Sequence, residues 1–75
     1  MIHLQAFARY RHQLGWDKLD LPLPAPATLG ALLEDPRLAG LPPEALLAVN
    51  ATFANRDAVL KDGDDVALMP PVSGG

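Results

Sequence analysis

The sequence has 75 residues, a length that favours one small domain and leaves no room for a separate catalytic domain. Hydrophobic residues make up 49% of it and charged residues 20%, which excludes disorder caused by low hydrophobicity. The net charge is −3 and the six bases are scattered along the chain, which argues against a nucleic-acid partner, because binding to phosphates needs a basic face.

The first third of the chain predicts a β-hairpin. Hydrophobic residues recur at every second position from Ile2 to Ala8, a pattern typical of a half-buried strand. This alternation directs Phe7 away from the core. A turn around Gly15 leads to a second alternating segment, Lys18 to Leu23, which we expect at an edge because Pro22 cannot donate a hydrogen bond to a neighbouring strand.

The middle of the chain predicts one main helix. Residues 24–27 read Pro-Ala-Pro-Ala and predict an extended linker, and Thr28 is a suitable N-cap. Leucines lie on one face of the helix that follows. It is expected to end before Pro36, because the residue that precedes a proline is disfavoured in the α conformation.

Short strands are predicted in the second half. Residues 46–49 and 52–54 are strand-like segments separated by a turn or a bulge at Asn50. Residues 61–64, Lys-Asp-Gly-Asp, form the clearest turn signal in the chain. A last strand follows, in which Val66 and Leu68 alternate with other residues. The element order predicts an α+β fold, a mixed sheet with one main helix packed across it.

The body of the chain offers no convincing catalytic or metal-binding group. Cysteine is absent, which excludes disulfides, thiolate metal sites and cysteine nucleophiles. His3 and His12 lack the spacing of metal ligands, and the acidic residues around Gly63 lack the later oxygen ligands of a calcium loop. The one serine, Ser73, has no histidine near it in sequence. No metal is therefore expected.

The chain carries no signal for a membrane. Its longest uncharged stretch, Leu21 to Leu33, contains three prolines and is too short to span a bilayer. The first ten residues include His3, Gln5 and Arg9, so they lack the apolar core of a signal peptide. A cytoplasmic protein without a membrane partner is expected.

The last two residues are glycines and suggest chemistry at the terminal carboxylate. Gly74 and Gly75 have no Cβ, so an extended tail that ends in them can enter a narrow channel of a partner. Adenylation would turn the carboxylate into an acyl donor that sulfur or an amine could attack. The chain then divides into a domain, residues 1–71, and a flexible tail, residues 72–75. A frayed end without function is the alternative.

Three segments resemble a known family. They are Phe7-Ala8-Arg9-Tyr10-Arg11, Val49-Asn50 and the last fourteen residues, Asp62 to Gly75. In them the chain resembles the MoaD family of ubiquitin-like sulfur carriers, the small subunits of molybdopterin synthase, and the resemblance covers nearly the whole chain. It implies a β-grasp, ubiquitin-like fold, which agrees with the element order above.

The resemblance also implies a reaction. Gly75 would be adenylated by a ubiquitin-activating-like adenylyltransferase that uses ATP, and then converted to a thiocarboxylate with sulfur from a donor enzyme. The tail, with Gly74, would enter the large subunit of molybdopterin synthase and give sulfur to cyclic pyranopterin monophosphate. The family implies a heterotetramer with two copies of each subunit. The catalytic residues would belong to the large subunit, so this chain would bind no cofactor and would not be an enzyme alone.

An apolar patch is the docking surface in this family. Phe7 and Met69 match it and fall on the outer strand face, where exposed apolar side chains indicate an interface. Phe53 also matches, but it shares the parity of Val49, so its exposure requires the bulge at Asn50; burial in the core is the alternative. The partner-binding residues that the resemblance implies are Phe7, Phe53, Met69, Pro70, Pro71, Val72 and Ser73.

Two departures and several alternatives stand beside this interpretation. The segment after the helix is short and rich in proline, and Met69 stands where an aromatic residue is often found in the family. The chain could instead carry sulfur for thiamine, cysteine or tRNA thiolation. It could also be a ubiquitin-like modifier that joins Gly75 to a lysine amine, or a binding protein in which Gly75 has no role.

Overall fold

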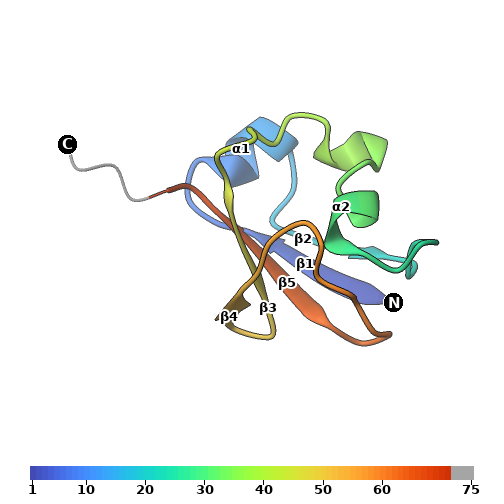
Figure 1. The fold of residues 1–75 in the computed structure, drawn as a ribbon. Coiled ribbons are helices and arrows are strands. Elements are labelled where there is room, and N and C mark those ends of the chain that lie inside the picture. Colours follow the sequence, from blue (N-terminus) through green and yellow to red (C-terminus); the bar gives the residue numbers. More distant parts are fainter. Residues whose placement is uncertain (72–75) are drawn as a thin grey trace.

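The computed structural model describes residues 1–71 (Figure 1). Val72, Ser73, Gly74 and Gly75 lie outside the described residues. The elements, in chain order, are β1 (Ile2–Ala6), α1 (Tyr10–Leu14), β2 (Lys18–Leu21), α2 (Leu29–Leu32), the 3-10 helix η1 (Pro36–Leu38), β3 (Leu46–Val49), β4 (Thr52–Phe53) and β5 (Asp65–Met69). No helix within residues 1–71 is long and apolar enough to cross a membrane.

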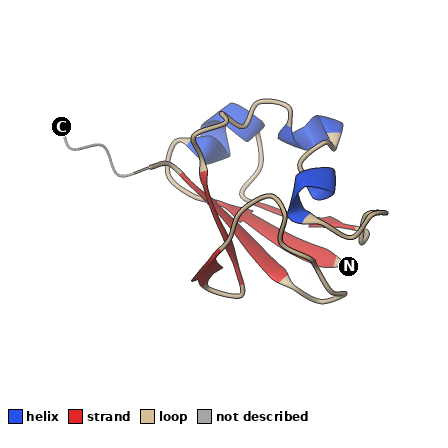
Figure 2. Cartoon of the chain, viewed as in Figure 1, coloured by secondary structure: helices blue, strands red, loops and turns tan. Residues whose placement is uncertain are grey.

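The five strands form one mixed sheet in the order β2-β1-β5-β3-β4. β1 and β5 are parallel, and the other neighbours are antiparallel. The last strand in the sequence, β5, is therefore the central strand of the sheet. The helices lie on one side of the sheet (Figure 2). We call the opposite side the open face. The predicted α+β class with a mixed sheet is confirmed.

The hydrophobic core lies between the sheet and the helices. Alternate residues of β1 and β5 point into it, as the period-2 pattern predicts. Its fully buried members include Ile2 and Leu68 from the sheet and Tyr10 and Leu29 from the helices. Each large apolar side chain buried in this way contributes about 1.5 to 3 kcal/mol to folding. The core thus extends under β2, β1, β5 and β3 and leaves the open face to other contacts.

The helical side differs in one detail from the prediction of one main helix: residues 1–71 contain three short ones. The sequence pattern did not indicate α1. β1 ends at Ala6 rather than Ala8, because Ala8 adopts a positive φ of 53° that breaks the strand. α1 then places Tyr10 in the core and ends at Gly15, whose φ of 83° suits a helix C-cap.

α2 begins where the sequence predicts. The Thr28 hydroxyl accepts a hydrogen bond from the backbone N–H of Ala31 at 3.2 Å, so Thr28 is the N-cap. The helix has only four residues. Pro36 then starts η1, and the carboxylate of Asp35 caps η1 by accepting a hydrogen bond from the backbone N–H of Arg37. The expected end of the main helix before Pro36 is confirmed.

The connection between β3 and β4 is a two-residue turn. Asn50 and Ala51 both have a positive φ, 50° and 67°, as in the turns that fit the twist of a hairpin. Ala48 consequently pairs with Phe53. Residues paired across two strands share a face, so Phe53 lies on the face of Ala48, opposite that of Val49. The expectation that its exposure needs a bulge was wrong, because parity counted along the chain does not continue through a turn.

Candidate partner-docking site

Strand pairing gathers apolar residues at one end of the open face. Ala67 pairs with Ala48, which pairs with Phe53, and in the next row Met69 pairs with Leu46. Phe53 is 71% exposed and Phe7 38% exposed, whereas Met69 is half-buried. We call these residues the docking surface: Phe7, Leu46, Ala48, Phe53, Ala67 and Met69. Exposed aromatic side chains on an apolar surface are typical of protein interfaces.

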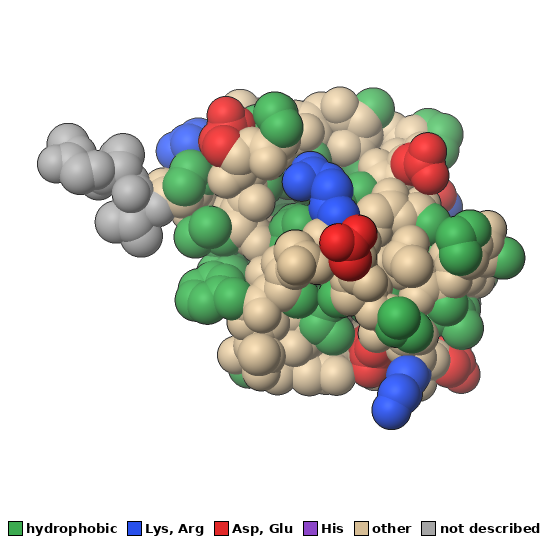
Figure 3. Space-filling model, viewed as in Figure 1, with side chains coloured by type: hydrophobic (Ala, Val, Ile, Leu, Met, Phe, Trp, Pro, Cys, Tyr) green, Lys and Arg blue, Asp and Glu red, His purple; other side chains and the backbone are tan. Residues whose placement is uncertain are grey.

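Phe7 joins this surface from β1. Its backbone N–H donates to the carbonyl of Leu68 at 3.0 Å, which continues the parallel pairing of β1 with β5 by one residue. Phe7 therefore comes next to Met69 on the open face. Hydrophobic side chains gather on the side of the molecule where β5 ends (Figure 3). The structure thus brings together the three residues that were predicted for docking, Phe7, Phe53 and Met69.

Pro70 and Pro71 follow β5 directly and are half-buried. Proline has no backbone N–H and cannot extend the sheet, so the chain stops pairing with β1 and β3 at this point. Met69, a member of the docking surface, is the last residue of β5, so this exit lies beside the docking surface. Figure 1 shows the chain leaving the sheet at this end of β5. The remaining predicted site residues, Val72, Ser73, Gly74 and Gly75, are among those that the structure does not describe, so their roles remain predictions.

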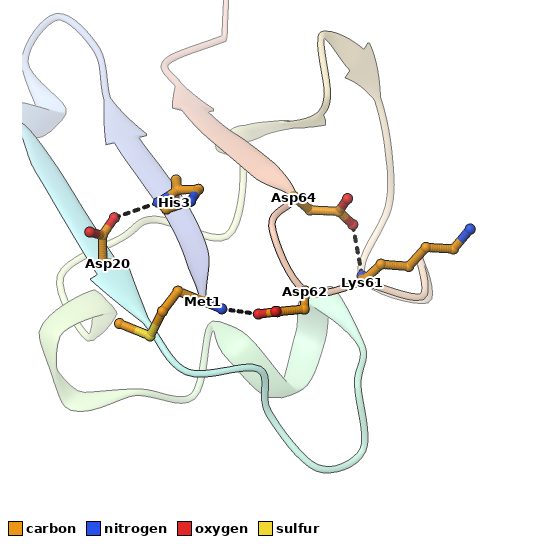
Figure 4. Close-up of polar contacts among 6 residues, drawn as sticks. All are labelled: Met1, His3, Asp20, Lys61, Asp62 and Asp64. Carbon is orange, nitrogen blue, oxygen red and sulfur yellow. Dashed lines mark hydrogen bonds and ion pairs between the residues drawn. The ribbon is translucent and has the colours of Figure 1, made fainter.

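The other end of the open face is polar. His3, Gln5, Lys18, Asp20 and Asp65 line a shallow depression there. His3 Nδ1 and Asp20 Oδ1 are 2.8 Å apart, and both side chains are exposed (Figure 4). Among residues 1–71, no three His, Asp or Glu side chains come close enough together to hold a metal ion.

The acidic turn predicted at residues 61–64 is held by its own hydrogen bonds. Asp64 Oδ2 accepts from the backbone N–H of Lys61 at 2.8 Å (Figure 4), and Oδ1 accepts from Asn50 Nδ2 at 3.0 Å. These two bonds, that from Lys61 first, hold the pKa of Asp64 below the usual range of an aspartate. The N-terminal ammonium pairs with Asp62 in the same turn. Both carboxylate oxygens of Asp64 therefore accept hydrogen bonds within the protein, one from inside the turn and one from Asn50.

Sequence reasoning missed three members of the docking surface: Ala67 in β5, and Leu46 and Ala48 in β3. All four residues of β3 are apolar, so hydrophobicity alone does not distinguish its two faces. The register with β5 makes the distinction: Leu47 lies opposite Leu68 on the core face, which places Leu46 and Ala48 on the open face.

The strand order, with the central C-terminal strand and the helices on one side, makes this chain a ubiquitin-like protein of the β-grasp fold, as expected. The model of the ThiS family matches residues 4–75, and the chain belongs to this family. A molybdopterin synthase sulfur carrier subunit from Escherichia coli (strain K12) is 36% identical to it, and the match covers all of both chains. A protein with the same description from Arabidopsis thaliana is 30% identical, over 99% of this chain and 82% of its own length.

Known structures give the same fold. A proposed molybdopterin converting factor, subunit 1, from Pyrococcus furiosus superposes with a TM-score of 0.82 at 30% sequence identity. The match covers 95% of this chain and 97% of that one. The β-grasp architecture therefore holds over nearly the whole length of both.

Proposed function

We propose that this chain is the sulfur-carrier subunit of a molybdopterin synthase, and that the carboxyl group of Gly75 carries the sulfur. Membership of the ThiS family and the names of the relatives support the proposal. One structural observation carries it. The chain leaves the central strand at Pro70, beside the exposed docking surface, so a partner that covers this surface is well placed to receive the residues after Pro71.

The chemistry needs an activated carboxylate. The Gly75 carboxylate attacks the α-phosphate of ATP in an adenylyltransferase, which forms an acyl adenylate and releases pyrophosphate. A sulfide equivalent from a sulfur donor enzyme displaces AMP and leaves a thiocarboxylate. Glycine suits the two last positions, because the absence of Cβ allows close approach to the reacting atoms in both partners. This chain itself binds no cofactor in the proposal, and the ATP belongs to the activating enzyme.

The large subunit supplies the catalytic residues in this proposal. It binds cyclic pyranopterin monophosphate, whose reacting carbon is attacked by the thiocarboxylate sulfur; water then hydrolyses the acyl–sulfur bond, which leaves the sulfur on the pterin and restores the Gly75 carboxylate. The expected assembly is a heterotetramer with two copies of each subunit, in which each carrier docks through the docking surface, Pro70, Pro71, Val72 and Ser73. The proposal locates the reaction in the cytoplasm, where ATP is available to the activating enzyme.

The amount of exposed apolar surface suits such a docking contact. Phe53 keeps 71% of its surface in contact with solvent, which is costly for an aromatic side chain unless a partner covers it. A few buried aromatic anchors usually supply most of the binding free energy of an interface. Phe7 and Phe53 are the anchors we expect, with the small residue Ala67 and the buried Ala48 on the sheet between them.

Reconstitution with mass spectrometry tests this function. The chain is incubated with the adenylyltransferase, the sulfur donor enzyme and ATP, and its intact mass is measured; a parallel sample lacks ATP. We expect replacement of one oxygen by one sulfur only with ATP. Adding the large subunit and cyclic pyranopterin monophosphate should then return the original mass and produce molybdopterin.

Other outcomes would redirect the assignment. A thiocarboxylate that forms but does not react with the large subunit would indicate a carrier for another pathway, such as thiamine, cysteine or tRNA thiolation. Covalent adducts with lysines of other proteins would indicate a modifier. An unchanged mass with active enzymes and ATP would contradict every function that depends on Gly75.

A further inference from the structure

The strand that carries Phe53, β4, has few attachments to the rest of the sheet, whereas its hairpin partner β3 pairs with β5 along its whole length. β4 has two residues and lies at the sheet edge, so it pairs only with β3. Phe53 is largely exposed, so packing of its own side chain contributes little to its position. Beyond the paired residues, the N–H of Ala54 donates to the carbonyl of Leu47 at 2.9 Å. The place of Phe53 on the docking surface therefore depends on how the β3–β4 turn is held.

Asn50 holds this turn through three hydrogen bonds to residues at the start of β5. Its backbone N–H donates to the carbonyl of Asp65 at 2.8 Å. Its Oδ1 accepts from the backbone N–H of Asp65 at 3.0 Å, and its Nδ2 donates to Asp64 Oδ1 at 3.0 Å. The donor and the acceptor of one carboxamide are thus both used across a separation of 14 to 15 residues in sequence.

Residues 61–64, which precede β5 and include the Asn50 partner Asp64, are themselves held by hydrogen bonds. The carbonyl of Asp64 accepts from the N–H of His3 in β1 at 2.9 Å, and its carboxylate accepts from the N–H of Lys61. The N–H of Gly63 donates to the carbonyl of Met1 at 2.8 Å. Asn50 therefore ties the turn that leads into the weakly held edge strand β4 to a part of the structure that is bonded to β1.

We infer that Asn50 is a positioning residue for partner binding: its carboxamide fixes the β3–β4 hairpin, and thereby Phe53, on the docking surface. Asn50 itself lies at the polar end of the open face and contributes through Phe53 rather than through the apolar contact. This inference depends on the proposed docking to a large subunit. It adds a residue outside the apolar patch to the determinants of that docking.

The variant for the test is Asn50→Gly. Glycine adopts a positive φ without strain, so this change removes the carboxamide while it keeps the turn. Alanine would remove the carboxamide and would also strain the turn, because its Cβ disfavours a positive φ. Asn50→Asp serves as a second variant: it retains an acceptor for the Asp65 amide, loses the donor to Asp64, and adds a carboxylate that repels the carboxylate of Asp64. Thermal unfolding confirms that each variant is folded at the assay temperature, and Asn50→Asp replaces Asn50→Gly if the latter is not.

The affinity for the large subunit is measured by titration calorimetry in two double-mutant cycles. Asn50→Gly should weaken binding about 3- to 10-fold, as the loss of one or two hydrogen bonds does. In the Phe53→Ala background the same change should weaken it less than about 2-fold, because its effect is exerted through Phe53. In the Phe7→Ala background, the control cycle, the full effect should remain.

An effect of Asn50→Gly that is absent, or that is equally large with and without Phe53, overturns the inference. If Phe53→Ala leaves affinity unchanged, the proposed docking surface fails, and the inference fails with it. If Phe53→Ala weakens binding but the cycle shows no coupling to Asn50, only the inference fails.

Discussion

At the scale of single residues, aromatic side chains of the same chain have opposite environments. Tyr10 is fully buried between the helices and the sheet, while Phe7 and Phe53 lie on the open face, 38% and 71% exposed. Burial of Tyr10 stabilises the domain, whereas the solvent-exposed part of each phenylalanine side chain gains nothing from folding and is available to a partner. Substitutions at the two kinds of position should therefore affect different measurements.

Phe7→Ala and Phe53→Ala should each weaken binding to the large subunit by about 1 to 3 kcal/mol, the usual cost of truncating an aromatic anchor. Titration calorimetry measures this. Val59→Ala is the matched control, because Val59 is 73% exposed and is not part of the docking surface. An unchanged affinity in the Phe7 variant would remove Phe7 from the interface, and a comparable loss in the Val59 variant would show that the effect is not local.

Tyr10 permits a prediction about stability alone. Its hydroxyl is buried and finds no hydrogen-bond partner among residues 1–71. Because an unsatisfied buried polar group costs about 1 to 3 kcal/mol, Tyr10→Phe should leave the free energy of unfolding unchanged or raise it by up to about 2 kcal/mol. Urea denaturation measures the change. A clear loss of stability would mean that the hydroxyl has a partner in solution.

At the scale of elements, the helical side is made of short pieces that depend on their ends. Isolated helices as short as α2 do not form in water, so the cap and the contacts with the sheet must hold it. Thr28 holds the start of α2 in two ways. Its hydroxyl caps the helix, and its backbone forms an isolated β-bridge with Val59, outside the strands of the sheet. The helical side and the docking surface lie on opposite faces, so damage to one should spare the other.

Thr28→Ala should lower the free energy of unfolding by about 1 kcal/mol, because the N–H of Ala31 loses its acceptor. Thr28→Ser keeps the hydroxyl and should recover most of this stability. Affinity for the large subunit, measured below the unfolding transition, should stay unchanged in both variants. A serine variant as unstable as the alanine variant would show that the hydrogen bond is not the cause.

At the scale of the whole molecule, folding and the proposed chemistry occupy different parts of the chain. The core cluster extends from Ile2 to Leu68, and every member precedes Pro70. The proposed reactive group, the Gly75 carboxyl, lies beyond the residues that the structure describes. In the proposed function, the folded part presents a surface for recognition and the reaction takes place at the last residue.

Deletion of Gly75 should abolish thiocarboxylate formation and sulfur transfer, because the carboxyl group moves back by one residue. The free energy of unfolding should change by less than about 0.5 kcal/mol, since the core found among residues 1–71 ends at Leu68. Intact mass and urea denaturation give the two readouts. A variant with one alanine added after Gly75 provides a second displacement of the carboxyl group and should also be inactive. Retained sulfur transfer in the deletion variant would contradict the proposed role of Gly75.

Local patterns in the sequence determined a large part of this protein. Alternation of side chains identified β1 and β5, hydroxyl chemistry identified Thr28 as a cap, and turn residues identified the loop at residues 61–64. Each of these features depends on neighbours within a few positions in the sequence, so the chain alone is sufficient to predict them.

Only the tertiary structure decided which apolar residues lie together on the open face. Phe7, Phe53 and Met69 come together because β5 inserts between β1 and β3, a pairing of distant segments that no local pattern encodes. The face on which Phe53 lies depended on the two-residue turn at Asn50. The formation of α1 depended on the positive φ of Ala8 and on the burial of Tyr10 in the core. The free energy of such contacts is gained only when remote parts of the chain meet, so these features cannot be read from sequence neighbours.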